Sequence, residues 1–488
     1  MEANSASKPA YRMLWMWLLL AWVVSYADRT ITGPVVTYMI GHNVSFIGES
    51  STPYALGGLI GSMFFAGYML TQFPGGYLGD RFGHRAIIVI SVVWAGIATI
   101  VSGLMTALLG FVALRIITGL GEGTFYSNDR TVITQQTPFE KRSFGMGIVI
   151  TGLAIGLTLA IIFTPPLINL GESVLGTSED AWRMPFFVTG LVTLVVAFGM
   201  AKFFRGQRGQ YRFRPAYLPA LRELGKYSVI FLVVIMAVFF AADRAGLPEW
   251  TVAVLLAFVA LLLVGFVFGR KGEEVSPVLY NRDLLLIYIS AIAFLWNLWF
   301  FSFWSVAIVS QAATQATFTH AALTAAFNAG AGILGFPAGG WLADYAKRRG
   351  WGRKILLIAF TLVEGLLTVA FGLYIINGGQ ALSVMGVLLF FQALFFFALQ
   401  PVSHALTADL VPTPALLGAA FGLWNLIGEI GAVLSPGISG ALRDATGEWH
   451  AAVMLDAGII LASIVLLLFV RESRAPSAEQ SSEAEVTT

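Results

Sequence analysis

Asp28 and Arg29 stand side by side inside an apolar stretch of the sequence, in the segment SYADRTITG. An ionisable side chain in the middle of a membrane helix costs about 2.5–3.5 kcal/mol, so such residues usually face an internal cavity. Neighbouring helical residues point about 100° apart, so these two cannot pair well with each other, and we expect each to have its own partner. We predict that Arg29 binds an anionic substrate and that Asp28 takes part in proton coupling. The alternative is that each belongs to a structural ion pair.

Arg115 and Glu122 form a second candidate group, in the segment LRIITGLGEG. Their spacing of seven residues places both on one face of a helix, two turns apart. Three glycines near them, Gly119, Gly121 and Gly123, allow another helix to approach closely. A carboxyl group in an apolar site beside a movable arginine can bind and release a proton. We therefore predict proton coupling by Glu122 together with Arg115, for which a structural ion pair is the alternative.

Two pairs of polar residues lie four positions apart, Tyr68 with Gln72 and Asn425 with Glu429. Each pair presents polar groups on one face of an otherwise apolar helix. We predict that Gln72 contacts the substrate and that Glu429 takes part in proton coupling. Hydrogen bonds between helices are the alternative, because Asn and Gln often have that role in a membrane.

Three more candidates for the substrate site lie in the second half of the chain. Asn297 and Trp304 share a helix face in FLWNLWFFSFWS, and Ser403 lies in QPVSH. Most aromatic side chains of such a segment pack or lie at the membrane interface, while a minority can wall a site for a planar or bulky molecule. His404, next to Ser403, is a weaker candidate, because a single histidine on a membrane helix is more often structural.

A repeated motif carries the candidate gate. GGYLGDRFGHR, residues 75–85, is echoed by GGWLADYAKRRGWGRK, residues 339–354, at an offset of 264 residues. This repeat indicates two related halves, each with the motif at the end of its second helix. Charged side chains at such a helix end can hold one of two alternating states closed. We assign this gating role to Asp80, Arg81, Arg85, Arg130 and Asp344.

Only a membrane protein can position these residues. Of the 488 residues, 57% are hydrophobic and 11% are charged, against about 25% charged in soluble domains. Apolar runs of about 18 residues or more, which can cross about 30 Å of hydrocarbon, recur along the chain. Cysteine is absent, which excludes disulfides and thiolate chemistry. We predict fourteen helices, near residues 13–40, 53–79, 85–105, 107–135, 144–170, 183–203, 227–242, 251–268, 284–312, 319–346, 353–377, 381–408, 415–441 and 449–470.

Positive charges cluster in alternate connections between these helices, for example at Lys141 and Arg142 and from Lys202 to Lys226. This bias indicates that those connections and both termini are cytoplasmic. The tail after Arg471 is polar and too poor in apolar residues to fold. We expect residues 1–12 to form a cytoplasmic tail, 13–203 a six-helix bundle, 204–283 a basic linker with two extra helices outside the bundles, 284–470 a second six-helix bundle and 471–488 a disordered tail.

The motif at residues 75–85 resembles the signature loop of the major facilitator superfamily, and LRIITGLGEG resembles its fourth-helix motif, with Arg115 as the arginine. Asp28-Arg29, GYMLTQFPGG, GEGTFYSNDRTV and FGLWNLIGEIGAVLSPGISG resemble the anion:cation symporter group of that superfamily. The resemblance covers nearly the whole chain apart from the inserted helices. It implies transport of organic anions such as sugar acids, commonly with protons, and places Tyr68 and Asn425 at substrate-contacting positions. Glu429 departs from the amide expected in that group.

The sequence therefore predicts an all-α membrane protein with the major facilitator fold, formed by two six-helix bundles and two inserted transmembrane helices. We predict a secondary active transporter that carries a small organic anion, a carboxylate, in symport with protons by alternating access. Two alternatives stay open: an exporter of amphipathic or lipid-like molecules, and a non-transporting membrane sensor. We expect no enzyme activity, cofactor, metal or nucleic-acid partner, and a monomer that crosses a bacterial inner membrane several times.

Overall fold

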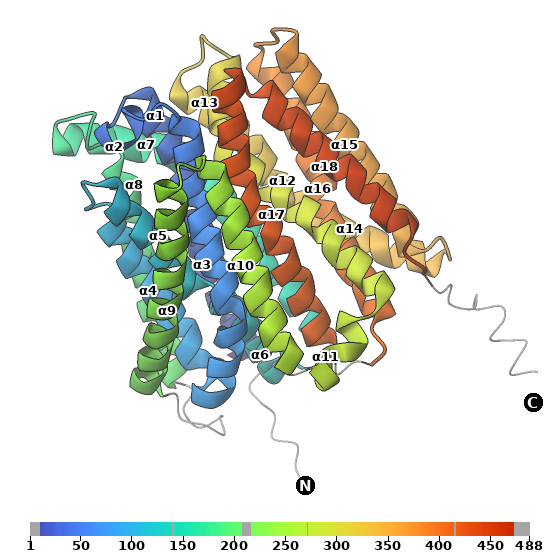
Figure 1. Cartoon of the computed structure of the whole chain (residues 1–488). Helices are drawn as coiled ribbons and strands as arrows, with labels where there is room; N and C mark the ends of the chain where they lie inside the picture. Colours follow the sequence, from blue (N-terminus) through green and yellow to red (C-terminus); the bar gives the residue numbers. More distant parts are fainter. Residues whose placement is uncertain (1–9, 139–140, 207–215, 271, 414–415, 473–488) are drawn as a thin grey trace, which may run out of the picture.

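The chain folds into two helical bundles, with the first half of the sequence on the left of Figure 1 and the second half on the right. The computed structural model describes residues 10–138, 141–206, 216–270, 272–413 and 416–472, and every regular element in these ranges is a helix. The first bundle contains α1 (Ala10–Gly41), the short α2 (Ser45–Gly48), α3 (Pro53–Phe82), α4 (His84–Ser102), α5 (Leu108–Glu122), α6 (Phe125–Gln136), α7 (Arg142–Leu175) and α8 (Arg183–Gly206).

The second bundle follows after three helices that connect the two halves. The connecting helices are α9 (Tyr217–Arg244), α10 (Glu249–Arg270) and α11 (Gly272–Leu279). The second bundle contains α12 (Arg282–Ala312), α13 (Phe318–Gly330), α14 (Gly332–Arg348), α15 (Arg353–Ile376), α16 (Leu382–Leu410), α17 (Leu417–Thr446) and α18 (His450–Leu468).

Twelve segments of the described chain are long and apolar enough to cross a membrane, with α5–α6 and α13–α14 each forming one segment. Neither α1 nor α10 is among the twelve. α1 has 32 residues, but polar residues such as Asp28 and Arg29 lower its mean hydropathy, and the apolar part of α10 that qualifies as a shorter helix is Glu249–Leu262. The all-α membrane fold is confirmed, and the count of fourteen spanning helices stays a prediction.

Local sequence signals explain where several helices begin and end. The Asn281 side chain accepts hydrogen bonds from the backbone N–H groups of Asp283 and Leu284 and so caps the start of α12. Thr317 caps α13 in the same way. Gly83 adopts a positive φ of 95° between α3 and α4, a conformation that glycine reaches without a steric penalty.

Two expected helices are divided in the structure. The helix expected at 107–135 forms α5 and α6, which separate at Gly123, where a side chain would collide with the backbone carbonyl of Tyr68. Glycine permits this close approach of α5 to α3 but weakens the helix that contains it. The helix expected at 319–346 forms α13 and α14, which separate at Ala331 between two glycines.

The expected start of the first inserted helix, near residue 227, is wrong, because α9 begins at Tyr217. Ala220 and Leu224, four residues apart on one face of α9, pack against Leu78 and Ile87 of the first bundle. Burial of this face stabilises the first turns of α9, although the positive charges of this part of the sequence predict a linker. Residues 207–215 of the expected linker and residues 473–488 of the expected tail lie outside the described residues.

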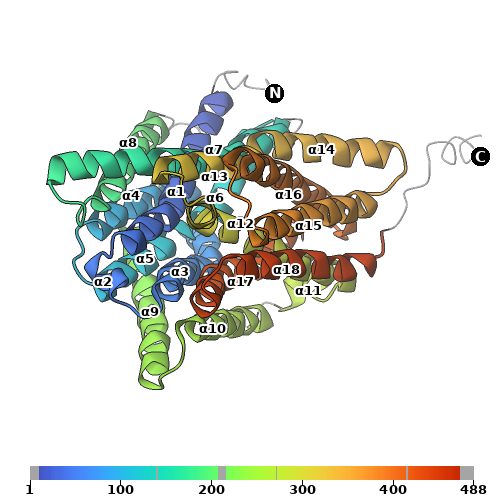
Figure 2. The same cartoon turned by 90° about the horizontal axis from the view of Figure 1, so that it is seen from above.

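The two bundles meet along α3 with α17 and along α7 with α13, while α1 packs against α12 between these two contacts. The view in Figure 2 shows α9 and α10 along one side of the molecule, where α9 packs on α3 and α10 packs on both α3 and α17. The inserted pair therefore lies against the outside of the α3–α17 contact.

The bundles are joined tightly at one end, which we call the outer end, where α1 ends and α3 begins. There the Ala55 N–H donates to Asp444 Oδ2 at 2.7 Å and the Gly437 N–H donates to Ser62 Oγ at 3.2 Å. A side chain at Gly58 would collide with the Pro436 carbonyl, so α3 and α17 touch backbone to backbone. At the opposite, inner end, the ion pairs formed by the described residues link groups of the same bundle.

Candidate substrate and proton site

Arg29 and Glu122 form a direct ion pair between α1 and α5. The Arg29 Nε–H donates to Glu122 Oε2 at 2.6 Å, and both side chains are nearly inaccessible to solvent, at 3% and 2% exposed. Ser25, one turn before Arg29, donates its hydroxyl to the same carboxylate oxygen at 2.6 Å. Glu122 Oε1 has no hydrogen-bond partner. The site thus holds one compensated charge pair and one free carboxylate oxygen.

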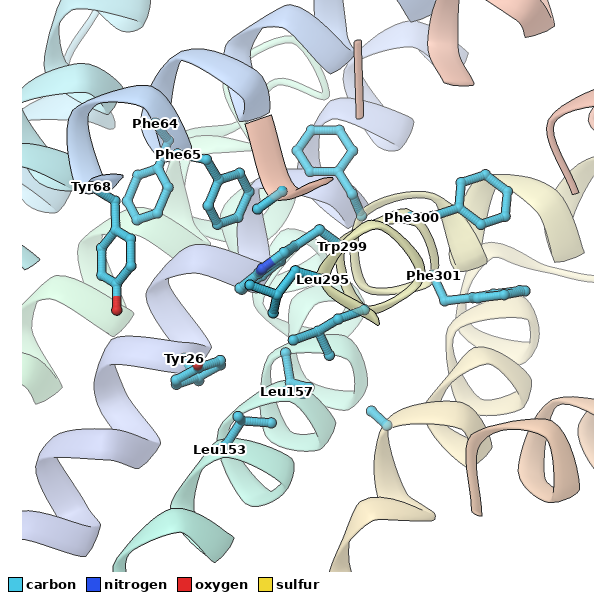
Figure 3. Packing of buried hydrophobic residues seen from close by; sticks show 14 of the residues in the cluster. Tyr26, Phe64, Phe65, Tyr68, Leu153, Leu157, Leu295, Trp299, Phe300 and Phe301 are labelled. Atoms are coloured by element: carbon cyan, nitrogen blue, oxygen red, sulfur yellow. The ribbon is translucent and has the colours of Figure 1, made fainter. Parts of the chain in front are cut away.

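Two tyrosine rings contact the Arg29 guanidinium. Its carbon lies 4.2 Å from the centre of the Tyr68 ring and 4.6 Å from that of Tyr26, within the range of cation–π attraction. Figure 3 shows the Tyr26 and Tyr68 rings on neighbouring helices, with Trp299 of the second bundle nearby. The Trp299 ring stacks on Tyr26 at 5.9 Å, so an aromatic wall from both bundles surrounds the arginine.

Asp28 takes a different partner, as predicted from its angular separation from Arg29. Its Oδ1 accepts the Thr99 hydroxyl at 2.6 Å and lies 3.6 Å from Nη1 of Arg115. Arg115 is completely buried and donates through Nη2 to three hydroxyl oxygens, those of Thr99, Ser102 and Thr118, at 3.0–3.3 Å. Asp28 Oδ2 has no hydrogen-bond partner. Arg115 and Glu122 therefore serve two ion pairs on the same helix, and the carboxyl groups of Asp28 and Glu122 are close enough to interact with each other.

The two polar pairs found by spacing meet across the interface between the bundles. Asn425 Nδ2 donates to Gln72 Oε1 at 3.0 Å and to Glu429 Oε1 at 3.3 Å. Glu429 lies close enough to Arg29 for their opposite charges to attract. Glu429 also interacts with the Gln72 side chain, so Gln72, Asn425 and Glu429 form one polar cluster next to Arg29.

Three predicted substrate residues lie outside this group. Asn297 donates to Asp456 within the second bundle at 2.6 Å, and Trp304 donates to the Pro436 carbonyl at 3.0 Å near the outer end. Ser403 accepts a hydrogen bond from Trp424 at 3.0 Å. The structure brings Arg29, Tyr68, Gln72 and Asn425 together, and it gives Asn297, Trp304 and Ser403 partners elsewhere in the second bundle.

The predicted gate residues lie toward the inner end, each with a partner in its own bundle. Asp80 lies 3.4 Å from His84, and the guanidinium groups of Arg81 and Arg85 stack on Phe82 and Phe204. Arg130 stacks on Trp22 and lies 3.8 Å from Asp129. Asp344 pairs with Arg353 at 3.1 Å. Their gating role stays a prediction.

The sequence did not predict the hydroxyl donors of the site or the aromatic side chain that the second bundle contributes. Ser25 and Thr99 complete the carboxylate contacts, but small hydroxyl residues are common in membrane helices and give no distinct signal. Trp299 was hidden among the other aromatic residues of its segment. A clearer signal was overlooked at Glu364 and Asp456, which are single acidic residues inside apolar runs, as Asp28 is.

The sequence pattern of the Major Facilitator Superfamily matches residues 18–318 and 286–488, so the chain belongs to this family of membrane transporters. It is 25% identical over 419 residues to a D-galactonate transporter of Escherichia coli O6:H1, over 83% of this chain and 84% of that protein. It is 24% identical over 467 residues to the probable galactarate/D-glucarate transporter GudP of Bacillus subtilis, over 93% of this chain and 90% of that protein. The fold is similar to that of a D-xylose-proton symporter, with a TM-score of 0.68, 16% identity and coverage of 95% and 98% of the two chains.

Proposed function

We propose that this transporter carries a small organic anion, a carboxylate such as a sugar acid, in symport with protons. The observation that carries the proposal is the buried pair of Arg29 and Glu122 between two tyrosine rings. An arginine offers a planar fork of donors that fits a carboxylate. The relatives named for galactonate, galactarate and glucarate support a polyhydroxy acid as the substrate class.

The shared use of Arg29 couples the proton to the substrate. When Glu122 is ionised, it occupies the Nε–H of Arg29 and competes with an anionic substrate for that donor. A proton on Glu122 removes its negative charge, so Arg29 turns to the substrate carboxylate. Proton and anion therefore bind together, which is the requirement for symport.

Asp28 is the second proton carrier of this proposal. When Asp28 is protonated, it loses its negative charge, but Arg115 still donates hydrogen bonds to the hydroxyl oxygens of Thr99, Ser102 and Thr118. These hydroxyls keep the buried guanidinium hydrogen-bonded in both protonation states of Asp28. Glu429 is a third carboxyl group of the site and, after Glu122, the second that attracts Arg29.

The remaining polar groups suit a hydroxylated anion. The Gln72 amide and the Glu429 carboxyl group lie together in the polar cluster next to Arg29, and a substrate hydroxyl group can bind to either type of group. The bundles are joined at the outer end, so we expect the site to open toward the inner end in this state. With the positive-inside bias this is the cytoplasmic side of an inner membrane. Asp80, Arg81, Arg85, Arg130 and Asp344 would then form the cytoplasmic gate in the opposite state.

Uptake by the purified protein in liposomes tests the proposal. We expect galactonate, galactarate or glucarate to accumulate inside when the external pH is lower, and the accumulation to disappear when a protonophore collapses the gradient. Movement of fluorescent lipid without organic-anion uptake would favour an exporter of amphipathic molecules. Binding of these acids without flux would favour a sensor, and either result contradicts symport.

A further inference from the structure

The second bundle contains two carboxyl groups that the proposed cycle does not use. Glu364 on α15 and Asp456 on α18 are both completely buried. Both lie in apolar segments, and they are close enough to interact electrostatically. Buried carboxyls that repel each other need either a nearby cation or a proton.

A chain of side-chain amides connects these two acids. Asn328 donates to Gln392 Oε1 at 2.9 Å, and Gln392 Nε2 donates to Glu364 Oε1 and to Asn297 Oδ1, each at 3.2 Å. Asn297 Nδ2 in turn donates to Asp456 Oδ2 at 2.6 Å. Each amide orients the next one in the chain. The N–H groups of Gln392 and Asn297 that end the chain therefore donate to the two carboxyl groups.

The amides satisfy one oxygen of each acid and leave the other free. Glu364 Oε2 and Asp456 Oδ1 are buried and have no hydrogen-bond partner. A carboxylate accepts at both oxygens, whereas a protonated carboxyl has a donor of its own. The two buried carboxylate oxygens without a partner are therefore the candidate positions for added protons.

No cation neutralises this cluster in the part of the chain that the structure describes, where every ion pair involves other acids. Neighbouring helices supply neutral groups, namely Asn297 of α12, Asn328 of α13, Gln392 of α16 and Thr368 of α15 itself. The charged residues of α14 lie toward the inner end, and those of α17 lie beside Arg29 or at the outer end.

On α16, Asp409 pairs with Lys347 and Arg353, and His404 packs on Trp424. Arg282 and Asp283 of α12 stand at its first turn.

We propose that Glu364 and Asp456, linked by Asn297 and Gln392, form a second proton-binding site, in the second bundle and separate from the Arg29–Glu122 pair. Protonation adds one hydrogen ion to a carboxylate oxygen and removes one buried negative charge, with no other reactant. Repulsion between the acids makes the two protonation steps depend on each other. A role of this proton in transport rests on the proposed function, whereas the binding of a proton at this site does not depend on it.

Infrared difference spectroscopy of the purified transporter, recorded as the pH is raised, tests the binding. The carboxylic-acid C=O band of the wild type is expected to fall as the acids ionise, and part of that change is expected to vanish in Glu364→Gln and another part in Asp456→Asn. Thr368→Val is the matched control, because Thr368 is buried on the same helix and bonds only to the Glu364 backbone carbonyl. An unchanged band amplitude in both acid variants would overturn the proposal.

A second variant tests the same site in case the acid variants do not fold. Gln392→Leu keeps both acids and removes the amide N–H that Glu364 accepts, so the frequency of the Glu364 band is expected to shift. A spectrum identical to the wild type contradicts the site. In liposomes, the number of protons per substrate is expected to fall by about one in Asp456→Asn if the site takes part in the cycle. If the wild type shows no pH-driven uptake, the proposed function fails while the infrared titration still decides this proposal.

Discussion

The Arg29 guanidinium is engaged in two ways at once. Its Nε–H bonds to Glu122, while its guanidinium carbon lies over the rings of Tyr26 and Tyr68. A lysine ammonium is a compact point charge that can neither form a two-pronged contact with a carboxylate nor stack flat between two rings.

We therefore expect Arg29→Lys to weaken binding of the organic anion by about tenfold or more, which corresponds to the loss of one charged hydrogen bond of about 1.5–3 kcal/mol. Isothermal titration calorimetry of the purified variant measures this. Arg205→Lys, at an exposed arginine near the end of α8, is the control and should bind as the wild type does. Equal affinity of Arg29→Lys and the wild type would remove Arg29 from the substrate site.

The second ion pair, between Asp28 and Arg115, predicts a strong coupling in stability. Removal of one partner from a buried pair leaves an uncompensated charge and costs about 3–5 kcal/mol. Arg115→Gln should therefore lower the midpoint of thermal unfolding strongly, because Asp28 stays buried. The double variant Asp28→Asn with Arg115→Gln removes both charges and should recover part of that loss.

A double-mutant cycle from melting curves, followed by intrinsic tryptophan fluorescence, measures the coupling between Asp28 and Arg115. Strictly additive effects of the two substitutions would show that the residues act independently, against the contact in the structure. The separate partners of Asp28 and Arg29 follow from their adjacency on a helix. Which partner each one takes does not, because it depends on how α1, α4 and α5 rotate against one another.

At the scale of helices, α3 and α17 are in close contact at the outer end, and we expect this contact to set the conformational state. Gly58 lies against the Pro436 carbonyl and Gly440 against that of Tyr54, so both helices use glycine to approach closely. A larger residue at such a contact costs about 1–3 kcal/mol through overpacking. A larger residue therefore destabilises the state that is closed at the outer end. It does not destabilise a state in which the two helices separate there.

We expect Gly58→Val to shift the population toward the outward-open state by about tenfold, the ratio equivalent to 1.4 kcal/mol. The chain has no cysteine, so a single Ser62→Cys reporter at this contact can be labelled without background. Its labelling by an external maleimide should accelerate in Gly58→Val. Gly422→Val on α17, where a side chain meets nothing within 4 Å, is the control. Equal labelling rates in both variants would contradict the proposed outer closure.

The helices themselves were largely predictable from apolar runs and charged breaks. The divisions of α5 from α6 and of α13 from α14 were not, because they depend on glycine contacts with other helices, such as that of Gly123 with Tyr68. The early start of α9 was missed for a similar reason, since Ala220 and Leu224 are stabilised by residues far away in the sequence. Periodicity within one segment contains no information about such contacts.

At the scale of the whole molecule, the two halves use their buried acids differently. In the first bundle, Asp28 and Glu122 each have an arginine partner. In the second bundle, Glu364 and Asp456 have only amides among the described residues. The sequence repeat predicted two related halves, but the contrast between arginine and amide partners appears only when the helices are assembled. The meeting of Gln72 with Asn425 likewise requires both bundles to be in place.

Glu122→Gln tests the central claim, that a proton on Glu122 frees Arg29 for the organic anion. The amide keeps the size of the protonated acid and carries no charge, so the variant should resemble the permanently protonated state. In liposomes we expect pH-driven accumulation of the organic anion to disappear, while counterflow exchange of labelled and unlabelled substrate without a gradient persists. Thr193→Val, which removes a hydroxyl of α8 that donates to the Thr189 backbone carbonyl, should retain accumulation. Accumulation by Glu122→Gln against the substrate gradient, at the level of the wild type, would contradict the account and move proton coupling to other carboxyls.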